Sequence, residues 1–399
     1  MAALLALTLV LRAPVTIVSP VLGEVRADLG LDAATAGLLT SVPVFCFGLL
    51  TPAASRLLRS TGINHGALYC LGAIIAGSIL RSAGGVATVF AGTVLLGVGM
   101  TIGNLVVPML IGRQFRHRAE LLSSAYTATV NIAVTTTMAA AVPLATALGW
   151  RWAIALPGVA LGTLALLLWL LVYPPGVRGA HPAVRRRAGL PDPAPAAPAS
   201  GPSSASTRLP PPLRRLTILL TVAFSAHTLA YYAVTAWLPS ALAELRGMTA
   251  LQAGAAASLF QAAGVIGPMM VPVLAGPARW SSRRILVAVA LGWASLPAGM
   301  LLAPALWPVW SVAAGMAQGA FFAAIMAVLI RRSRTVDENR RAVASMQTFG
   351  YCVAAVGPVL VGWLHQQVAG WTAPFLVMLA MVVVMGVASI AAVRAPATD

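Results

Sequence analysis

The feature that most limits how this chain can fold is a series of apolar segments, each about 20 residues or longer, that alternate with short polar loops. A helix of that length crosses the hydrocarbon core of a bilayer, which is roughly 30 Å thick. Only 9% of the residues are charged and 59% are hydrophobic, whereas a soluble domain carries about 25% charged residues. Too few polar residues remain to cover soluble domains, so we expect an all-α integral membrane protein.

The apolar segments predict twelve transmembrane helices, six on each side of one long polar stretch. They cover residues 3–22, 33–58, 64–82, 86–112, 120–147, 151–173, 214–241, 250–275, 282–303, 305–332, 341–365 and 371–394. The polar stretch is rich in Pro, Ala, Ser and Arg, which is typical of a disordered linker. We therefore expect an N-terminal bundle over residues 1–173, a cytoplasmic linker over 174–213 and a C-terminal bundle over 214–399.

The basic residues set the expected orientation of the helices. All 26 are arginine, only 9 residues are acidic, and the net charge is +17. With a cytoplasmic N-terminus, only Arg26, Arg81, Arg151 and Arg246 lie on the outer side of the membrane, and the other loop arginines lie on the cytoplasmic side. This distribution follows the positive-inside rule, so it requires no nucleic acid, and we expect both termini in the cytoplasm. The lack of lysine is typical of a GC-rich genome, which favours a bacterial protein of the inner membrane.

A weak internal repeat relates the two sets of six helices. ADLGLDAATAG begins at Ala27, and the similar AELRGMTALQAG begins at Ala243 with one residue inserted. GMTIGN at Gly99 and GMAQGA at Gly315 have the same spacing of 216 residues. Parallel repeats are typical of major facilitator transporters, whose substrate site lies near the midplane between the halves. We therefore expect that fold, with two pseudo-symmetric six-helix bundles.

One charge stands near the middle of the first apolar segment. About ten helical residues precede Arg12, which is roughly 15 Å, or half the hydrocarbon thickness. An arginine at that depth costs roughly 2.5–3.5 kcal/mol on insertion scales, and no segment holds an Asp or Glu deep inside it. We expect Arg12 to face a polar cavity and to bind either a substrate anion or, in a structural role, backbone carbonyls. Pro14 frees a carbonyl nearby and can bend the helix.

The lack of buried carboxylates also bears on proton coupling, because proton-coupled transporters often relay protons through an intramembrane Asp or Glu. His227, in the seventh segment, is the imidazole expected at membrane depth. Histidine titrates near neutral pH, which suits a proton switch. A neutral histidine that is hydrogen-bonded within the bundle is an equal alternative.

Other polar side chains recur near the midplane. They are Asn104, Tyr126, Asn131, Tyr231, Tyr232, Gln261, Gln318, Gln347 and Tyr351. Each alone is more often a hydrogen-bonding contact between helices than a ligand. As a group, we expect some of them to bind substrate together with Arg12 and His227.

Motifs for other chemistry are missing from the sequence. It has no P-loop, zinc motif or Gly-x-Ser-x-Gly elbow, so we expect neither an enzyme nor an ATP-driven transporter, and no cofactor or metal. The three cysteines lie in apolar segments without metal or disulfide spacing. No basic residue precedes the first segment, so we expect no cleaved signal peptide, and the true start could lie upstream.

Four segments carry a likeness to a known family. They are LRAPVTIVSPVLGEVRADLGL at Leu11, LLGVGMTIGNLVVPMLIGRQF at Leu95, GMAQGAFFAAIMAVLIRRS at Gly315 and SMQTFGYCVAAVGPVLVGWLH at Ser345. Together they resemble the cyanate transporter and 2-nitroimidazole exporter (CynX/NimT) family of the major facilitator superfamily. The resemblance implies a twelve-helix inner-membrane carrier that works by alternating access on small substrates such as cyanate or nitroimidazoles. Val10 stands where members often have Asn, and His227 near where many have Gln.

We therefore expect a secondary-active transporter for a small anionic or weakly acidic solute such as cyanate, anchored by Arg12. The alternative is an exporter of nitroimidazole-like or other small drug-like compounds, with Tyr231, Tyr232 and Trp237 stacking on a ring. A membrane sensor that transports nothing is a third interpretation, which the linker disfavours because its composition is typical of disorder. The expected partners are the small-molecule substrate and the lipid bilayer, and we expect a monomer.

Overall fold

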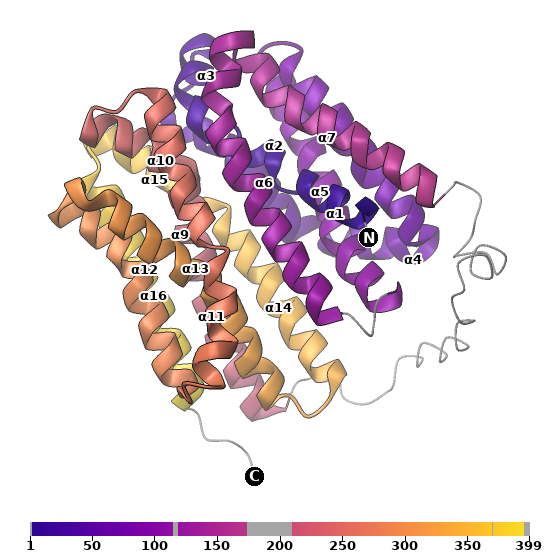
Figure 1. The fold of residues 1–399 in the computed structure, drawn as a ribbon, viewed down its shortest axis with the longest axis vertical. Coiled ribbons are helices and arrows are strands. Elements are labelled where there is room, and N and C mark those ends of the chain that lie inside the picture. Colours follow the sequence, from indigo (N-terminus) through magenta and orange to yellow (C-terminus); the bar gives the residue numbers. More distant parts are fainter. Residues whose placement is uncertain (1, 115–118, 174–209, 369, 395–399) are drawn as a thin grey trace.

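The protein is a helical bundle in the computed structural model, which describes residues 2–114, 119–173, 210–368 and 370–394. Its long helices run roughly side by side in two groups that follow one another in the sequence (Figure 1). The N-terminal half consists of α1 (Ala2–Val10), α2 (Ala13–Thr16), the 3₁₀ turn η1 (Ser19–Val21), α3 (Leu22–Leu29), α4 (Ala33–Ser82), α5 (Val86–Gln114), α6 (Ala119–Leu148) and α7 (Trp150–Val172). The C-terminal half consists of α9 (Pro211–Arg246), α10 (Ala250–Ala263), α11 (Ile266–Ala275), α12 (Ser282–Leu302), the 3₁₀ turn η3 (Pro304–Leu306), α13 (Trp307–Arg332), α14 (Val336–Ala354), α15 (Val356–Val368) and α16 (Thr372–Arg394).

The number of membrane crossings depends on α4. The described residues contain 11 segments that are long and apolar enough to cross a membrane. One of them, α4, has 50 residues, which is about 75 Å at 1.5 Å per residue and more than twice the hydrocarbon thickness. Inside it, Gly62 has φ 85° and ψ 167°, a conformation that is essentially restricted to glycine. The chain therefore forms one helix before Gly62 and a second helix after it. Counting these two separately gives the twelve predicted crossings.

The outer surface of the bundle is apolar, as a lipid-facing surface must be. Leu171 and Leu302 are 80% and 86% exposed. Moving such a side chain from water into lipid is favourable by roughly 1.5–3 kcal/mol. The exposed leucines thus agree with a multi-pass membrane protein.

Three predicted helices are interrupted, which corrects the continuous helices expected over 3–22, 250–275 and 341–365. Each interruption lies four or five residues before a proline. The helix ends and their prolines are Val10 and Pro14, Ala263 and Pro268, and Ala354 and Pro358. A proline ring clashes with the carbonyl four residues earlier and removes a hydrogen bond there. The first segment also extends beyond residue 22, because η1 and α3 continue it to Leu29.

The boundary between the halves is described only in part. The predicted linker over 174–213 falls mostly on residues 174–209, which lie outside the described residues. Helix α9 begins at Pro211, three residues before the predicted start of the C-terminal bundle at 214. A proline in the first turn is compatible with a helix because its missing N–H would have no partner there.

The two ends of the bundle differ in charge. We call the end that carries Arg56, Arg59, Arg283, Arg284, Arg331 and Arg332 the arginine-rich end. The opposite end, at α3 and at the turns between α9 and α10 and between α15 and α16, is the arginine-poor end (Figure 1).

The halves close on one another at the arginine-poor end. There α4 packs against α15, and α6 packs against α10. A Cβ atom added to Gly37 would lie 2.7 Å from the carbonyl oxygen of Pro358, and one added to Gly362 would lie 2.5 Å from that of Ala33. Only glycine permits backbones to approach so closely, so these contacts close the arginine-poor end.

Arg81 lies inside the bundle, at the end of the segment predicted over 64–82. Helix α4 continues to Ser82, so Arg81 is in its last turn and only 1% exposed. One Nη atom donates to the carbonyl of Ile154 on α7 at 2.9 Å. By contrast, Arg151 lies near the surface and forms a 2.8 Å ion pair with Asp28.

Candidate substrate site

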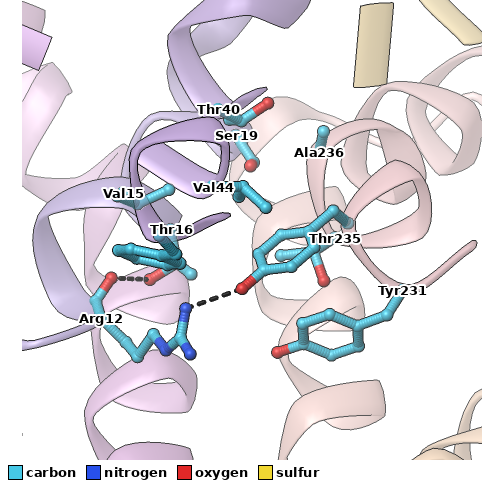
Figure 2. Close-up of a pocket in the computed structure, with 11 residues that line it drawn as sticks. Arg12, Val15, Thr16, Ser19, Thr40, Val44, Tyr231, Thr235 and Ala236 are labelled. Atoms are coloured by element: carbon cyan, nitrogen blue, oxygen red, sulfur yellow. Dashed lines mark hydrogen bonds between the residues drawn. The ribbon is translucent and has the colours of Figure 1, made fainter. Parts of the chain in front are cut away.

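A small cavity lies between the two halves, beside the interruption that follows α1. The residues that line it are Arg12, Val15, Thr16, Ser19, Thr40, Val44 and Phe47 from the N-terminal half and Tyr231, Tyr232, Thr235 and Ala236 from α9. Figure 2 shows Arg12 at one end of this group, with Ser19 and Thr40 toward the other. The cavity is small, with a volume of about 20 Å³, which is enough to hold water.

Arg12 lies at the interruption itself. Its backbone has φ −129° and ψ −31°, and its carbonyl accepts hydrogen bonds from the N–H groups of Val15 and Thr16 and from the Thr16 hydroxyl at 3.2 Å (Figure 2). The guanidinium donates to the hydroxyl of Tyr232 at 2.7 Å, and its Cζ lies 4.9 Å from the ring centre of Phe47. The acceptor that Arg12 requires is therefore a tyrosine from the other half.

A second polar network forms the wall of the cavity on α9. The Tyr231 hydroxyl donates to Oε1 of Gln261 at 3.2 Å, and Nε2 of Gln261 donates to the Thr235 hydroxyl at 2.9 Å. All three residues belong to α9 and α10, so this network stays within the C-terminal half. The rings of Tyr231 and Tyr232 meet edge to face, with centroids 5.1 Å apart. The network fixes Tyr231 and leaves Tyr232 to face Arg12.

The charge of the cavity is positive. None of the residues that line it carries a carboxylate. Tyr126 on α6 packs against the apolar cluster that contains Leu11, and Tyr351 on α14 packs edge to face on Phe47 with centroids 5.8 Å apart. Neutral aromatic groups thus surround Arg12, which leaves its charge without a neutralising partner among the described cavity residues.

Ser19 adds a second polar group to the cavity. It is 1% exposed, and its Oγ atom has no hydrogen-bond partner among the described residues. A buried hydroxyl without a partner costs roughly 1–3 kcal/mol. The nearby Thr40 hydroxyl donates to the carbonyl of Gly37 at 3.0 Å. Ser19 is therefore the hydroxyl in this cavity that a ligand can satisfy.

His227 lies apart from the cavity lining. It is 6% exposed, its Nδ1 accepts a 3.0 Å hydrogen bond from Nε1 of Trp293, and its ring stacks on Phe321 with centroids 4.4 Å apart. Because Nδ1 is an acceptor, the ring is neutral in this arrangement. This geometry favours the second of the two predicted roles, a histidine hydrogen-bonded within the bundle, and proton coupling stays a prediction.

The remaining predicted residues do not line the cavity. Gln318 on α13 is buried against Gly264, and Gln347 on α14 is half-buried. The Oδ1 atom of Asn104 on α5 is buried without a partner among the described residues, and Asn131 on α6 has an interaction of its own. Trp237, expected to stack on a ring substrate, is 1% exposed and donates to the carbonyl of Pro358 at 2.8 Å instead.

Sequence reasoning missed the short side chains of the cavity, namely Thr16, Ser19, Thr40 and Thr235, and the aromatic Phe47. Serine and threonine are common in membrane helices, where their hydroxyls bond the preceding turn. The sequence carries no signal that separates these hydroxyls from the others in the apolar segments, since Ser19 lies in the apolar stretch VTIVSPVL.

Comparison with proteins of known sequence finds relatives over nearly the whole chain. An uncharacterized transporter of Bacillus subtilis, YycB, is 31% identical over 95% of this chain and 89% of its own length. The 2-nitroimidazole transporter of Escherichia coli is 29% identical over 94% of this chain and 90% of its own length. The cyanate transport protein CynX of Escherichia coli is 25% identical over 89% of this chain and 87% of its own length.

Solved structures support the fold. A nucleoside transporter, NupG, superposes with a TM-score of 0.74 at 12% identity and covers 98% of this chain and 99% of its own. A bacterial homologue of the lysosomal transporter Spinster, in an inward-facing, occupied conformation, gives a TM-score of 0.72 at 14% identity, with 99% and 96% covered. The Major Facilitator Superfamily model matches residues 4–313 and 270–399. Its similarity to the 2-nitroimidazole transporter and to CynX is consistent with the CynX/NimT family. The chain therefore belongs to the major facilitator superfamily, as a transporter and not an enzyme.

Proposed function

We propose that the protein is a secondary-active carrier that moves a small anionic or weakly acidic solute, such as cyanate, across the inner membrane by alternating access. The observation that carries this proposal is the guanidinium of Arg12, which lines a cavity between the halves that holds no carboxylate. A charge in a low-dielectric site attracts an ion of opposite sign far more strongly than it does in water. An anion is therefore the ligand that Arg12 favours most.

The dimensions of the cavity support a small solute. The cavity is small, which suits a linear anion of three atoms better than a ring compound. The guanidinium offers several N–H donors in one plane, which suits a short anion with an acceptor at its end. Ser19, whose hydroxyl has no other partner among the described residues, supplies the next donor along the cavity.

The orientation follows from the arginines. In this proposal the arginine-rich end faces the cytoplasm, so the conformation described above is closed toward the outside. Epitope tags fused to both termini of the protein, and expressed in cells, test this orientation. Antibody access to either tag in intact spheroplasts contradicts it.

The main experiment measures ligand binding by thermal stability. The purified protein is heated with cyanate, nitrate or 2-nitroimidazole, in parallel with Arg12→Gln and with Arg246→Gln, which removes an exposed arginine at the end of α9. A ligand at 100 times its Kd stabilises the native state by about 2.7 kcal/mol. We expect cyanate to raise the melting midpoint of the parent and of Arg246→Gln but not of Arg12→Gln. The chain has no lysine amine for cyanate to modify.

The same experiment tests the second candidate, an exporter of nitroimidazole-like compounds. The paired rings of Tyr231 and Tyr232 form an aromatic wall in the cavity, and one relative is a 2-nitroimidazole transporter. A shift caused by 2-nitroimidazole that persists in Arg12→Gln, with none caused by cyanate, supports this candidate and assigns Arg12 a structural role.

A further inference from the structure

The partner of Arg12 is unusual because it comes from the half of the protein that must move. Arg12 belongs to the first segment, and Tyr232 belongs to α9, 220 residues later. Their 2.7 Å hydrogen bond crosses the cavity in which we place the substrate. Tyr232 is 7% exposed, so water does not readily replace it.

The neighbouring Tyr231 is bonded differently. Its hydroxyl donates to Gln261, which is itself bonded to Thr235, all within the C-terminal half. The two adjacent tyrosines therefore have different partners and different roles. Tyr231 stiffens the wall of the cavity, whereas the hydroxyl of Tyr232 occupies the guanidinium.

We propose that Tyr232 holds the place of the substrate in the empty carrier and that the anion displaces its hydroxyl from Arg12. This inference rests on the proposed function. The bond from the Arg12 guanidinium to the neutral Tyr232 hydroxyl is ionised on one side only. An anion on Arg12 adds the attraction between opposite charges, which is strong in a low-dielectric cavity. Tyr232 therefore satisfies Arg12 when no anion is present and yields to an anion when one arrives.

The displacement connects binding to movement. Opening the arginine-poor end separates α4 from α15 and draws α9 away from the first segment, which breaks the bond between Arg12 and Tyr232. Without an anion, that movement leaves a guanidinium unpaired inside the bundle, which is costly. With an anion bound, Arg12 keeps an acceptor throughout. The bond to Tyr232 thus holds the empty carrier closed at the arginine-poor end.

Two measurements on Tyr232→Phe test the inference, with Tyr231→Phe as the matched comparison. The first is the Kd of cyanate, titrated by thermal shift. We expect Tyr232→Phe to bind cyanate roughly tenfold more tightly, because no hydroxyl competes for Arg12. Tyr231→Phe does not gain affinity, because its hydroxyl bonds Gln261.

The second measurement needs no ligand. A cysteine at Ser19, in a chain whose native Cys46, Cys70 and Cys352 are replaced by alanine, reports access to the cavity from the arginine-poor end through its rate of reaction with an impermeant maleimide. We expect Tyr232→Phe to raise this rate severalfold in the absence of cyanate, and Tyr231→Phe to leave it close to that of the parent.

The outcomes separate the two ideas. If Tyr232→Phe binds cyanate more weakly, Tyr232 contacts the substrate and the displacement is wrong, although the proposed function stands. If neither the parent nor any variant binds an anion, the proposed function fails and displacement fails with it, and the maleimide rate still decides whether Tyr232 holds the carrier closed. An unchanged rate in Tyr232→Phe overturns that role as well.

Discussion

Replacing Gly37 by alanine tests how the arginine-poor end closes. The new Cβ would lie 2.7 Å from the carbonyl oxygen of Pro358, about 0.7 Å inside an ordinary contact of 3.4 Å. The three nearest atoms all belong to the backbone of Pro358 and Val359, so α4 and α15 must separate to make room. Overpacking of this kind costs roughly 1–3 kcal/mol, which shifts an equilibrium between two states by roughly 5–150-fold. The closed state loses that factor because only the closed state contains the clash.

The cysteine reporter at position 19 measures this shift. Maleimide added at the arginine-poor end should react with Gly37→Ala faster than with the parent by up to the same factor, and transport of cyanate into proteoliposomes should fall. The matched control is Gly72→Ala in the second helix of α4, after Gly62, where an added Cβ meets nothing within 4 Å. Equal labelling of Gly37→Ala, Gly72→Ala and the parent would refute the closure described here.

Three further predictions concern local structure. His227→Ala leaves the Nε1–H of Trp293 without its 3.0 Å acceptor, so we expect the free energy of unfolding to fall by roughly 1–3 kcal/mol. His227→Asn should lose less stability. A pH profile of transport that flattens in His227→Asn would instead support proton coupling. Gly62→Ala forces a side chain into φ 85°, ψ 167° and should cost roughly 1–3 kcal/mol; an unchanged melting midpoint contradicts the turn. Hydrogen bonds from the side chain and from the backbone N–H of Thr35 lower the pKa of Asp32. The contribution of Asp32 to stability is therefore present at neutral pH and disappears as pH falls through that pKa. Asp32→Ala should melt below the parent at pH 7 and together with it in acid, and a difference in melting midpoint that does not depend on pH refutes this.

The sequence predicts the helices well because a membrane span needs a long apolar segment, and such segments are visible without tertiary information. The interruptions were harder to predict. Pro14, Pro268 and Pro358 each follow an interruption, whereas Pro43 and Pro108 lie inside continuous helices. A proline therefore permits an interruption, and the packing around it decides whether one occurs.

The candidate site was predictable only from its charge. Arg12 is conspicuous because a charge in an apolar segment is costly and rare. Nothing local to either residue indicates that its acceptor is Tyr232 and not Tyr231, because that depends on how α9 turns toward the first segment. Ser19 and Thr40 were missed because short hydroxyls in membrane helices usually bond their own backbone, as Thr8 bonds Leu4 at 2.8 Å.

The bond between Arg12 and Tyr232 also has a consequence for the synthesis of the protein. Chain elongation proceeds at roughly 5–20 residues per second, so the 220 residues that separate the partners take roughly 11–44 s to make. During that interval the first segment has entered the membrane and its guanidinium has not yet met its acceptor. The N-terminal half therefore packs while Arg12 still lacks its acceptor. The first segment reaches its final hydrogen bonding only when α9 is inserted and Tyr232 accepts from Arg12.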